Sequence, residues 1–201
     1  MNRQEIADGL AAYARTVAHE RKLLPGDVLL IDSLATALAM RWPSESKGLK
    51  PSPAGINLMH EFEGYRPTTY RDPGSSNGKP YTGGWGTTTD ENGDPLPLGV
   101  TWPRERWEGL FQRDLEKFAA KVGALLDGAP TTQGQFDAMV SLAYNIGVGA
   151  FEGSTVLRKH KAGDYAGAAA AFGMWVKNDG KTMPGLVRRR AAEAKLYRGE
   201  T

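Results

Sequence analysis

Apolar side chains recur at intervals of three and four residues through the middle of the chain, as they do on one face of a helix. The first such stripe follows a helix start at Thr101, Pro103 and Glu105. Its members are Trp107, Phe111, Leu115, Phe118, Val122 and Leu125. The second stripe follows a capping box of Thr132 and Gln135. Its members are Phe136, Met139, Val140, Ala143 and Tyr144. We therefore expect two helices at the centre, the second of them buried.

Shorter elements are predicted on both sides of these two helices. A helix from Ala54 to about Glu63 would stop at Gly64. Residues 65–95 are rich in glycine and proline and predict short strands and turns. Further helices fit residues 154–161, 165–176 and 185–198. The pattern predicts a mainly helical α+β protein with one small β-rich insertion.

The first 50 residues form a segment of their own in this pattern. A Pro-Gly-Asp sequence separates two predicted helices, at residues 4–22 and 28–41. Residues 43–53 then hold three prolines, three serines and a glycine, which is typical of a linker. We expect residues 1–50 to be a helical N-terminal accessory segment with its linker, and residues 51–201 to be the main domain.

Composition excludes several classes of protein. The 201 residues carry 25 Lys and Arg against 23 Asp and Glu, so the near-neutral balance argues against a nucleic-acid-binding arm. The absence of cysteine excludes disulfides, thiolate metal sites and thiol nucleophiles. The three histidines show no zinc-binding spacing, and we expect no metal and no cofactor. The apolar stretch from Val28 to Met40 is too short and interrupted to span a bilayer, and no signal peptide is evident.

One stretch carries the residue types that cleavage of a glycosidic bond requires. Glu63 ends the predicted helix, Asp72 follows at a turn, and Thr82 lies beyond a Gly- and Ser-rich loop. Such cleavage uses a carboxylic acid that protonates the leaving oxygen and a second carboxylate across the sugar. The negative end of a helix favours the protonated form of Glu63, and a nearby arginine would favour the ionised form. Spacing alone equally fits residues with only local structural roles.

Several blocks of the sequence match one family in order. Residues 54–198 resemble the phage-type lysozymes, or endolysins, of glycoside hydrolase family 24. Glu63 and Asp72 have the spacing of the family pattern, and Thr82 fits it if the turn before Thr82 carries an insertion. The remaining matching blocks are Ser141–Phe151, Ser154–Lys159, and Trp175 with Gly185–Arg190 and Glu193. Two positions depart from the pattern, because Gly83 stands where the family often has isoleucine, and Thr87 stands where it often has histidine or asparagine.

The resemblance implies a lysozyme-like catalytic domain, with a small β-hairpin lobe and a larger helical lobe. It implies that Glu63 is the general acid, that Asp72 activates or positions the attacking water, and that Thr82 helps to hold that water. The bond it implies is the β-1,4 link between N-acetylmuramic acid and N-acetylglucosamine in peptidoglycan, cleaved with inversion.

Four further residues are candidate substrate contacts. Asn145 lies near a helix end and fits either a sugar contact or a cap. Arg189 and Arg190 could place a guanidinium near Glu63 and bind muramyl carboxylates. Their alternative is a helix surface stabilised by Arg190 with Glu193. Trp85 could stack on a sugar, although packing in the core is the commoner role of a tryptophan.

The resemblance also implies a biological setting. We expect a monomeric endolysin whose partner is peptidoglycan, with no nucleic acid and no stable membrane insertion. It would be made in the bacterial host cytoplasm without a signal peptide and would reach the periplasm after holin-type release. The alternatives are a lytic transglycosylase, which leaves an anhydromuramyl end, and a non-catalytic peptidoglycan-binding phage protein.

Overall fold

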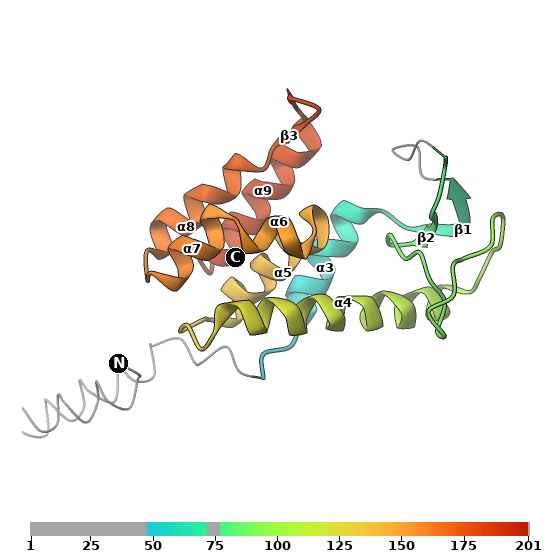
Figure 1. The fold of residues 1–201 in the computed structure, drawn as a ribbon, viewed down its shortest axis with the longest axis horizontal. Helices are drawn as coiled ribbons and strands as arrows, with labels where there is room; N and C mark the ends of the chain where they lie inside the picture. The colour runs from blue at the N-terminus through green and yellow to red at the C-terminus, as the bar shows by residue number, and fades with distance from the viewer. Residues whose placement is uncertain (1–47, 72–76, 201) are drawn as a thin grey trace, which may run out of the picture. The chain divides into compact units, whose positions relative to one another are not determined.

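The computed structural model of the chain describes residues 48–71 and 77–200 (Figure 1). The helices predicted at residues 4–22 and 28–41 lie outside the described residues. The accessory role of residues 1–50 therefore stays a prediction. Asp72 also lies outside the described residues, so its role stays a prediction too.

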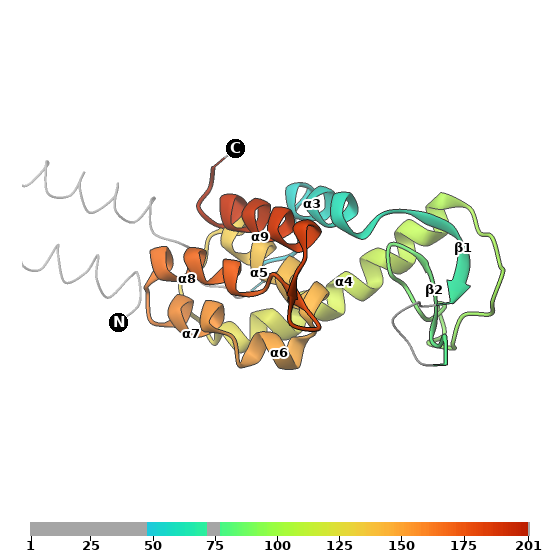
Figure 2. The same ribbon diagram turned by 90° about the horizontal axis from the view of Figure 1, so that it is seen from above.

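Besides the short helix that follows it, the central helix α5 (Gln133–Ile146) of the described part packs against three long helices. These are α3 (Pro53–Glu63), α4 (Arg104–Leu126) and α9 (Pro184–Tyr197). Figures 1 and 2 both place α5 inside this group. The predicted capping box begins α5, because the Thr132 hydroxyl accepts from the Gln135 amide and the Gln135 side chain accepts from the Thr132 amide. The buried helix expected from the sequence is confirmed.

Short elements connect α5 to α9. They are α6 (Val148–Glu152), α7 (Thr155–Lys161), α8 (Tyr165–Ala171), the 3₁₀ turn η1 (Phe172–Met174) and the hairpin of β3 (Lys177–Asn178) with β4 (Lys181–Thr182). The single helix predicted over 165–176 is therefore wrong in its second half. There η1 turns the chain out of α8, and the hairpin projects beyond the N-terminal end of α9 (Figure 1).

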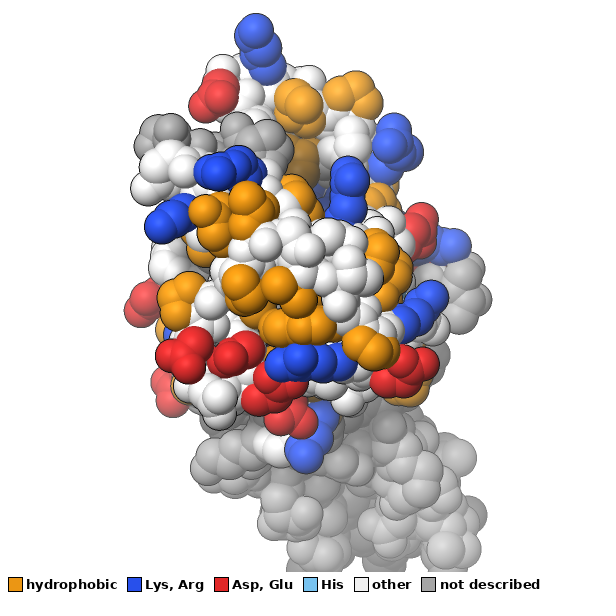
Figure 3. All heavy atoms as spheres, turned by 90° about the vertical axis from the view of Figure 1, so that its right-hand side faces the viewer, with side chains coloured by type: hydrophobic (Ala, Val, Ile, Leu, Met, Phe, Trp, Pro, Cys, Tyr) orange, Lys and Arg blue, Asp and Glu red, His pale blue; other side chains and the backbone are white. Residues whose placement is uncertain are grey.

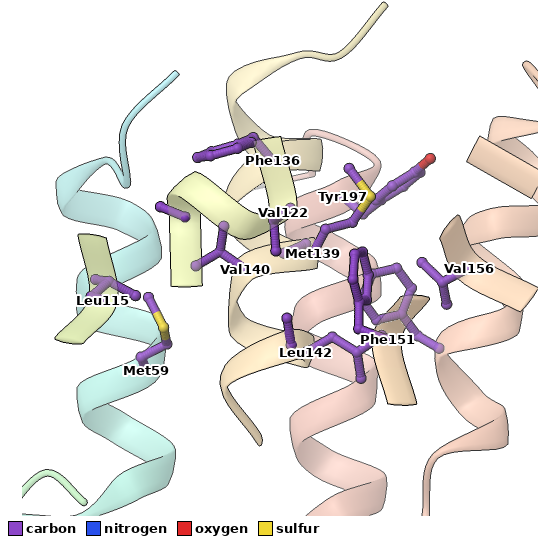
Figure 4. Close-up of a cluster of buried hydrophobic side chains, with 14 of the residues drawn as sticks. Met59, Leu115, Val122, Phe136, Met139, Val140, Leu142, Phe151, Val156 and Tyr197 are labelled. Carbon is purple, nitrogen blue, oxygen red and sulfur yellow. The ribbon is translucent and has the colours of Figure 1, made fainter. Parts of the chain in front are cut away.

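The hydrophobic core lies around α5 (Figure 4). Met59 and Leu115 reach it from α3 and α4, and Phe151 and Tyr197 reach it from the opposite side. All four are at most 3% exposed. Burying side chains of this size supplies most of the favourable free energy of folding.

The small lobe is built on β1 (Arg66–Arg71) and β2 (Tyr81–Gly84), which pair antiparallel with Tyr70 opposite Thr82. The side chain of Trp107 in α4 holds this lobe, because its indole donates a hydrogen bond of 2.9 Å to the Pro67 carbonyl. A side chain at Gly83 would collide with the same indole, so glycine permits the close approach.

The end of the molecule that carries β1 and β2 has a mixed surface. Figure 3 shows apolar side chains gathered in the middle of this face, with basic groups mostly above them and acidic groups mostly below. Tyr70 is 37% exposed there, and the Arg66 guanidinium lies 5.4 Å from its ring centre.

Within the described residues the structure is mainly helical with two small antiparallel sheets, as the α+β prediction expects. None of the helices described is both long and apolar enough to cross a bilayer.

A buried histidine joins α7, α9 and the connection between α4 and α5. His160 is 1% exposed, and its Nε2 lies 2.9 Å from the Thr131 hydroxyl while its Nδ1 lies 2.6 Å from the Tyr197 hydroxyl. The Thr131 hydroxyl donates to the Ala129 carbonyl, so Nε2 carries the ring proton and Nδ1 accepts from Tyr197. Burial lowers the pKa of His160 to about 4, which keeps the ring neutral at physiological pH.

This histidine should make folding sensitive to mild acid. Its folded pKa lies below the ordinary 6.5, so its contribution to stability is complete above pH 6.5 and is lost as the pH falls toward 4. Between pH 7 and pH 4.5 the wild type should lose about 2 kcal/mol more unfolding free energy than His160→Gln. Urea unfolding at the two pH values measures the difference. Equal losses in the two proteins would show that His160 does not cause it.

Candidate active site

Glu63 occupies the last position of α3, and the residues that flank this helix define both of its ends. At the start, Ser52 caps α3, and its hydroxyl also donates to Asp137 of α5 at 2.5 Å. At the end, Gly64 has φ +67° and stops the helix, as the sequence predicts. The Glu63 side chain is 19% exposed, so the carboxyl is placed firmly and still reaches solvent.

Arg189 of α9 lies against this carboxyl. Its Nη1 donates to Glu63 Oε1 at 2.7 Å, although the two residues are 126 positions apart in the chain. Arg189 is only 3% exposed. A guanidinium at this distance stabilises the carboxylate form of its partner.

A buried cluster lies behind Arg189. Its Nε donates to Glu193 Oε1 at 3.1 Å, and Arg190 Nη2 donates to the same oxygen at 2.8 Å. The Ser141 hydroxyl of α5 donates a third hydrogen bond to it at 2.7 Å. Burial raises the pKa of Glu193 and lowers that of Arg190, and the attraction between the opposite charges opposes both shifts.

The Tyr144 side chain and the backbone at Gly86 border the Glu63 carboxyl on another side. The Tyr144 hydroxyl of α5 donates to the Trp85 carbonyl at 3.1 Å. Burial first, and then the charge of Glu63, raise the pKa of Tyr144, so it is a neutral donor. A β-carbon at Gly86 would lie 3.9 Å from Glu63 Oε2, and Gly86 itself has φ +100°. Glycine therefore leaves bare backbone next to the carboxyl.

Glu63 lines two hollows in the surface. The larger has a volume of ≈ 720 Å³ and is bordered by the C-terminal ends of α3 and α5 and by the β3–β4 hairpin; Asn145, Trp175, Lys177, Asn178, Arg188 and Arg189 line it. The smaller, of ≈ 380 Å³, lies toward α4; Gly86, Thr88, Thr89, Asp114, Lys117, Phe118 and Tyr144 line it. An extended ligand that occupied both hollows would pass the Glu63 carboxyl.

The structure brings some of the predicted site residues together. Arg189 touches Glu63, and exposed Asn145 lines the larger hollow with it. Thr82 is half-buried in β2, where its hydroxyl donates to the Pro80 carbonyl at 3.5 Å. Asp72 follows β1 and lies outside the described residues, so the structure does not place it relative to Glu63.

Two predicted substrate contacts lie inside the protein. Trp85 is 2% exposed and stacks on the His60 ring at 4.1 Å, which fits the core-packing alternative. Arg190 is also 2% exposed and pairs with Glu193. This pairing was the alternative to a substrate contact, but the pair is buried and does not lie on an exposed helix surface. In this structure neither side chain is placed to touch a sugar.

The sequence pattern did not indicate Ser141 as a partner of the site. The signal for Ser141 was a polar residue within the apolar second stripe, because a buried hydroxyl needs a hydrogen-bond partner. Among residues 48–71 and 77–200, no group of three or more His, Asp and Glu side chains could hold a metal ion.

Comparison with known proteins identifies relatives of this chain. The family model described as phage lysozyme matches residues 60–193. The endolysin of Bacillus phage B103 is 41% identical over 146 residues, which is 73% of this chain and 53% of that protein. The chain thus spans about half the length of this relative and of the similar endolysin of Bacillus phage PZA.

Two solved structures are also similar to this chain. The endolysin from Escherichia coli O157:H7 phage FAHEc1 superimposes with a TM-score of 0.67 and 37% identity, over 75% of this chain and 94% of that one. The muramidase domain of SpmX from Asticaccaulis excentricus gives a TM-score of 0.65 and 34% identity, over 74% and 97%.

Proposed function

Because this chain belongs to the phage lysozyme family, we propose that it is a glycoside hydrolase that cleaves peptidoglycan as a muramidase. The lysozyme-like fold predicted from the sequence is confirmed by its solved relatives. The observation that supports the activity most directly is the placement of Glu63. It is a partly exposed carboxyl at the meeting point of two hollows, within the residues that the family model matches.

The proposed bond is the β-1,4 link between N-acetylmuramic acid and N-acetylglucosamine. Glu63, in its protonated form, gives its proton to the glycosidic oxygen as the bond to the anomeric carbon breaks. Arg189 then stabilises the carboxylate that remains, through the hydrogen bond of 2.7 Å. Arg189 therefore favours the state of Glu63 that follows proton transfer.

Water completes the proposed reaction from the opposite face of the sugar. Asp72 takes a proton from this water, whose oxygen attacks the anomeric carbon, and the Thr82 hydroxyl helps to position it. Attack from the face opposite the leaving group inverts the configuration. The support for these two roles is the family spacing of Glu63 and Asp72 and the place of Thr82 in β2, next to the end of β1.

The larger hollow suits a polar sugar chain. Asn145 and Asn178 offer amide donors and acceptors for hydroxyl and N-acetyl groups. Arg188 and Lys177 add positive charge at the edge of the same hollow, where a substrate carboxylate would be attracted. We place the glycan across both hollows, with the bond to be cleaved beside Glu63.

The products identify the reaction class. Purified peptidoglycan should yield muropeptides with reducing muramyl ends, which mass spectrometry distinguishes from anhydromuramyl ends. Proton NMR of the first-formed product should show the anomer expected for inversion. Anhydromuramyl ends would instead identify a lytic transglycosylase. Binding of the chain to peptidoglycan without product release would favour the non-catalytic alternative.

The proposed biological role is lysis of a bacterial host at the end of a phage cycle. The support is the endolysin relatives, together with the wall polymer on which the proposed activity would act. Cytoplasmic synthesis, holin-type release and a monomeric state stay predictions.

A further inference from the structure

We propose that Glu193 is a positioning residue, which holds Arg189 against the catalytic carboxyl and balances the positive charge beside it. This inference rests on the proposed role of Glu63 as the acid. Glu193 itself is 0% exposed and therefore cannot touch the substrate.

The contacts of Arg189 support this positioning role. Arg189 uses each of its three guanidinium nitrogens. Nη1 donates to Glu63, Nε donates to Glu193, and Nη2 donates to the Ser141 carbonyl at 3.3 Å. A planar group held on three edges has one orientation left. Glu193 thus holds one edge of Arg189, and the amide oxygen of a glutamine at this position could still accept the same hydrogen bond.

The charges of the cluster support the balancing role. Behind Glu63 the cluster contains two guanidinium cations and one carboxylate, on Arg189, Arg190 and Glu193. Removing this carboxylate would leave Glu63 to balance both cations, in a medium that screens charges poorly. Both would then attract the ionised form of Glu63 more strongly. An acid catalyst must be protonated, so its working pH range would move down.

Other charged or titratable groups among the described residues also lie near the Glu63 carboxyl. Tyr144 of α5 borders Glu63, and the hollows bring further groups toward it: Glu61, Asp114, Lys117, Lys177 and Arg188. These groups and Asp72 are the same in the wild type and in the variants below. A difference between the proteins therefore reports the cluster alone.

The decisive variant is Glu193→Gln, which keeps the shape of the side chain and removes its charge. On the alkaline side of the pH profile, peptidoglycan cleavage should fall at a pH about half a unit to one unit lower than in the wild type. At the upper pH values this shift is a three- to tenfold loss of activity. Activity on the acid side should change less. A merely structural role would lower activity at all pH values by one factor and leave this alkaline limb of the profile where it is, and that result would overturn the proposal.

A charge-matched double variant separates charge from packing. Arg190→Met combined with Glu193→Gln removes one cation and one anion, so the net charge of the cluster returns to that of the wild type. The alkaline limb should return with it. Glu200→Gln is the control, because it removes an exposed glutamate just beyond α9 and should not move the limb. A limb that stays displaced in the double variant would contradict the charge argument.

A direct titration keeps the inference separate from the proposed activity. Carbon-13 NMR follows the Glu63 carboxyl without any substrate, and its midpoint should be lower in Glu193→Gln than in the wild type. If Glu193→Gln does not fold, Arg190→Met is compared with the double variant, where the same change of Glu193 should again lower the midpoint. Equal midpoints would refute the inference even if the chain cleaves peptidoglycan. A lower midpoint would support it even if another reaction were found.

Discussion

Replacing Glu63 with glutamine should reduce kcat for peptidoglycan cleavage by about 10³-fold or more. The amide oxygen can still accept the hydrogen bond from Arg189, so the local structure should survive. The amide has no acidic proton to give to the leaving oxygen. The substrate should bind as before, because the change removes an interaction made in the transition state.

The measurement is the release of reducing muramyl ends under saturating peptidoglycan, with binding measured separately by co-sedimentation. Glu152→Gln is the matched control, because Glu152 is an exposed glutamate on α6 and does not line either hollow. It should retain wild-type activity. A Glu63→Gln protein that keeps more than about a tenth of wild-type kcat would remove Glu63 from the role of the acid.

Replacing Trp107 with alanine should cost about 3–5 kcal/mol of unfolding free energy. The indole is 0% exposed and packs on Gly83 and Gly84 of β2, while its nitrogen donates to the Pro67 carbonyl of β1. The variant would open a cavity and leave the Pro67 carbonyl without this donor. Activity should fall as well, because Trp107 fixes the strand that carries Thr82.

Urea unfolding of the full chain measures this cost, and Trp107→Phe is the informative comparison. Phenylalanine keeps most of the buried surface and loses the hydrogen bond, so it should cost about 1–2 kcal/mol. Leu98→Ala, at a side chain that is 43% exposed, should change stability by less than about 0.5 kcal/mol. A cost below about 1 kcal/mol for Trp107→Ala would show that the small lobe does not depend on this contact.

Glu63 and Trp107 act on the two lobes whose side chains the proposed reaction brings together. Glu63 and Arg189 belong to α3 and α9 of the helical lobe, while Thr82 belongs to the small lobe that Trp107 holds on α4. The proposed reaction needs groups from both sides at one bond, and small displacements between catalytic groups reduce rates strongly. The Trp107→Ala protein should therefore lose activity at urea concentrations where it is still folded.

The amino-acid sequence alone was enough to predict most local elements of the main domain, although not η1 or the β3–β4 hairpin. Apolar spacing predicted α4 and α5, because one buried face of a helix repeats every three to four residues. The capping box at Thr132 and the stop at Gly64 were also visible, because each depends on neighbours within a few positions. The order of matching blocks predicted the family, and with it the lysozyme-like fold.

Only the tertiary structure decided which charged residues are buried and which line the site. Arg190 and Glu193 have the composition and spacing of an exposed helix face, and the structure buries both, because α5 brings Ser141 to the same place. The pair of Glu63 with Arg189 joins residues 126 positions apart. No local pattern predicts such a contact, since it depends on how α3 and α9 pack on α5. The same packing forms the hollows beside Glu63, where the sequence could supply the residue types but not their positions.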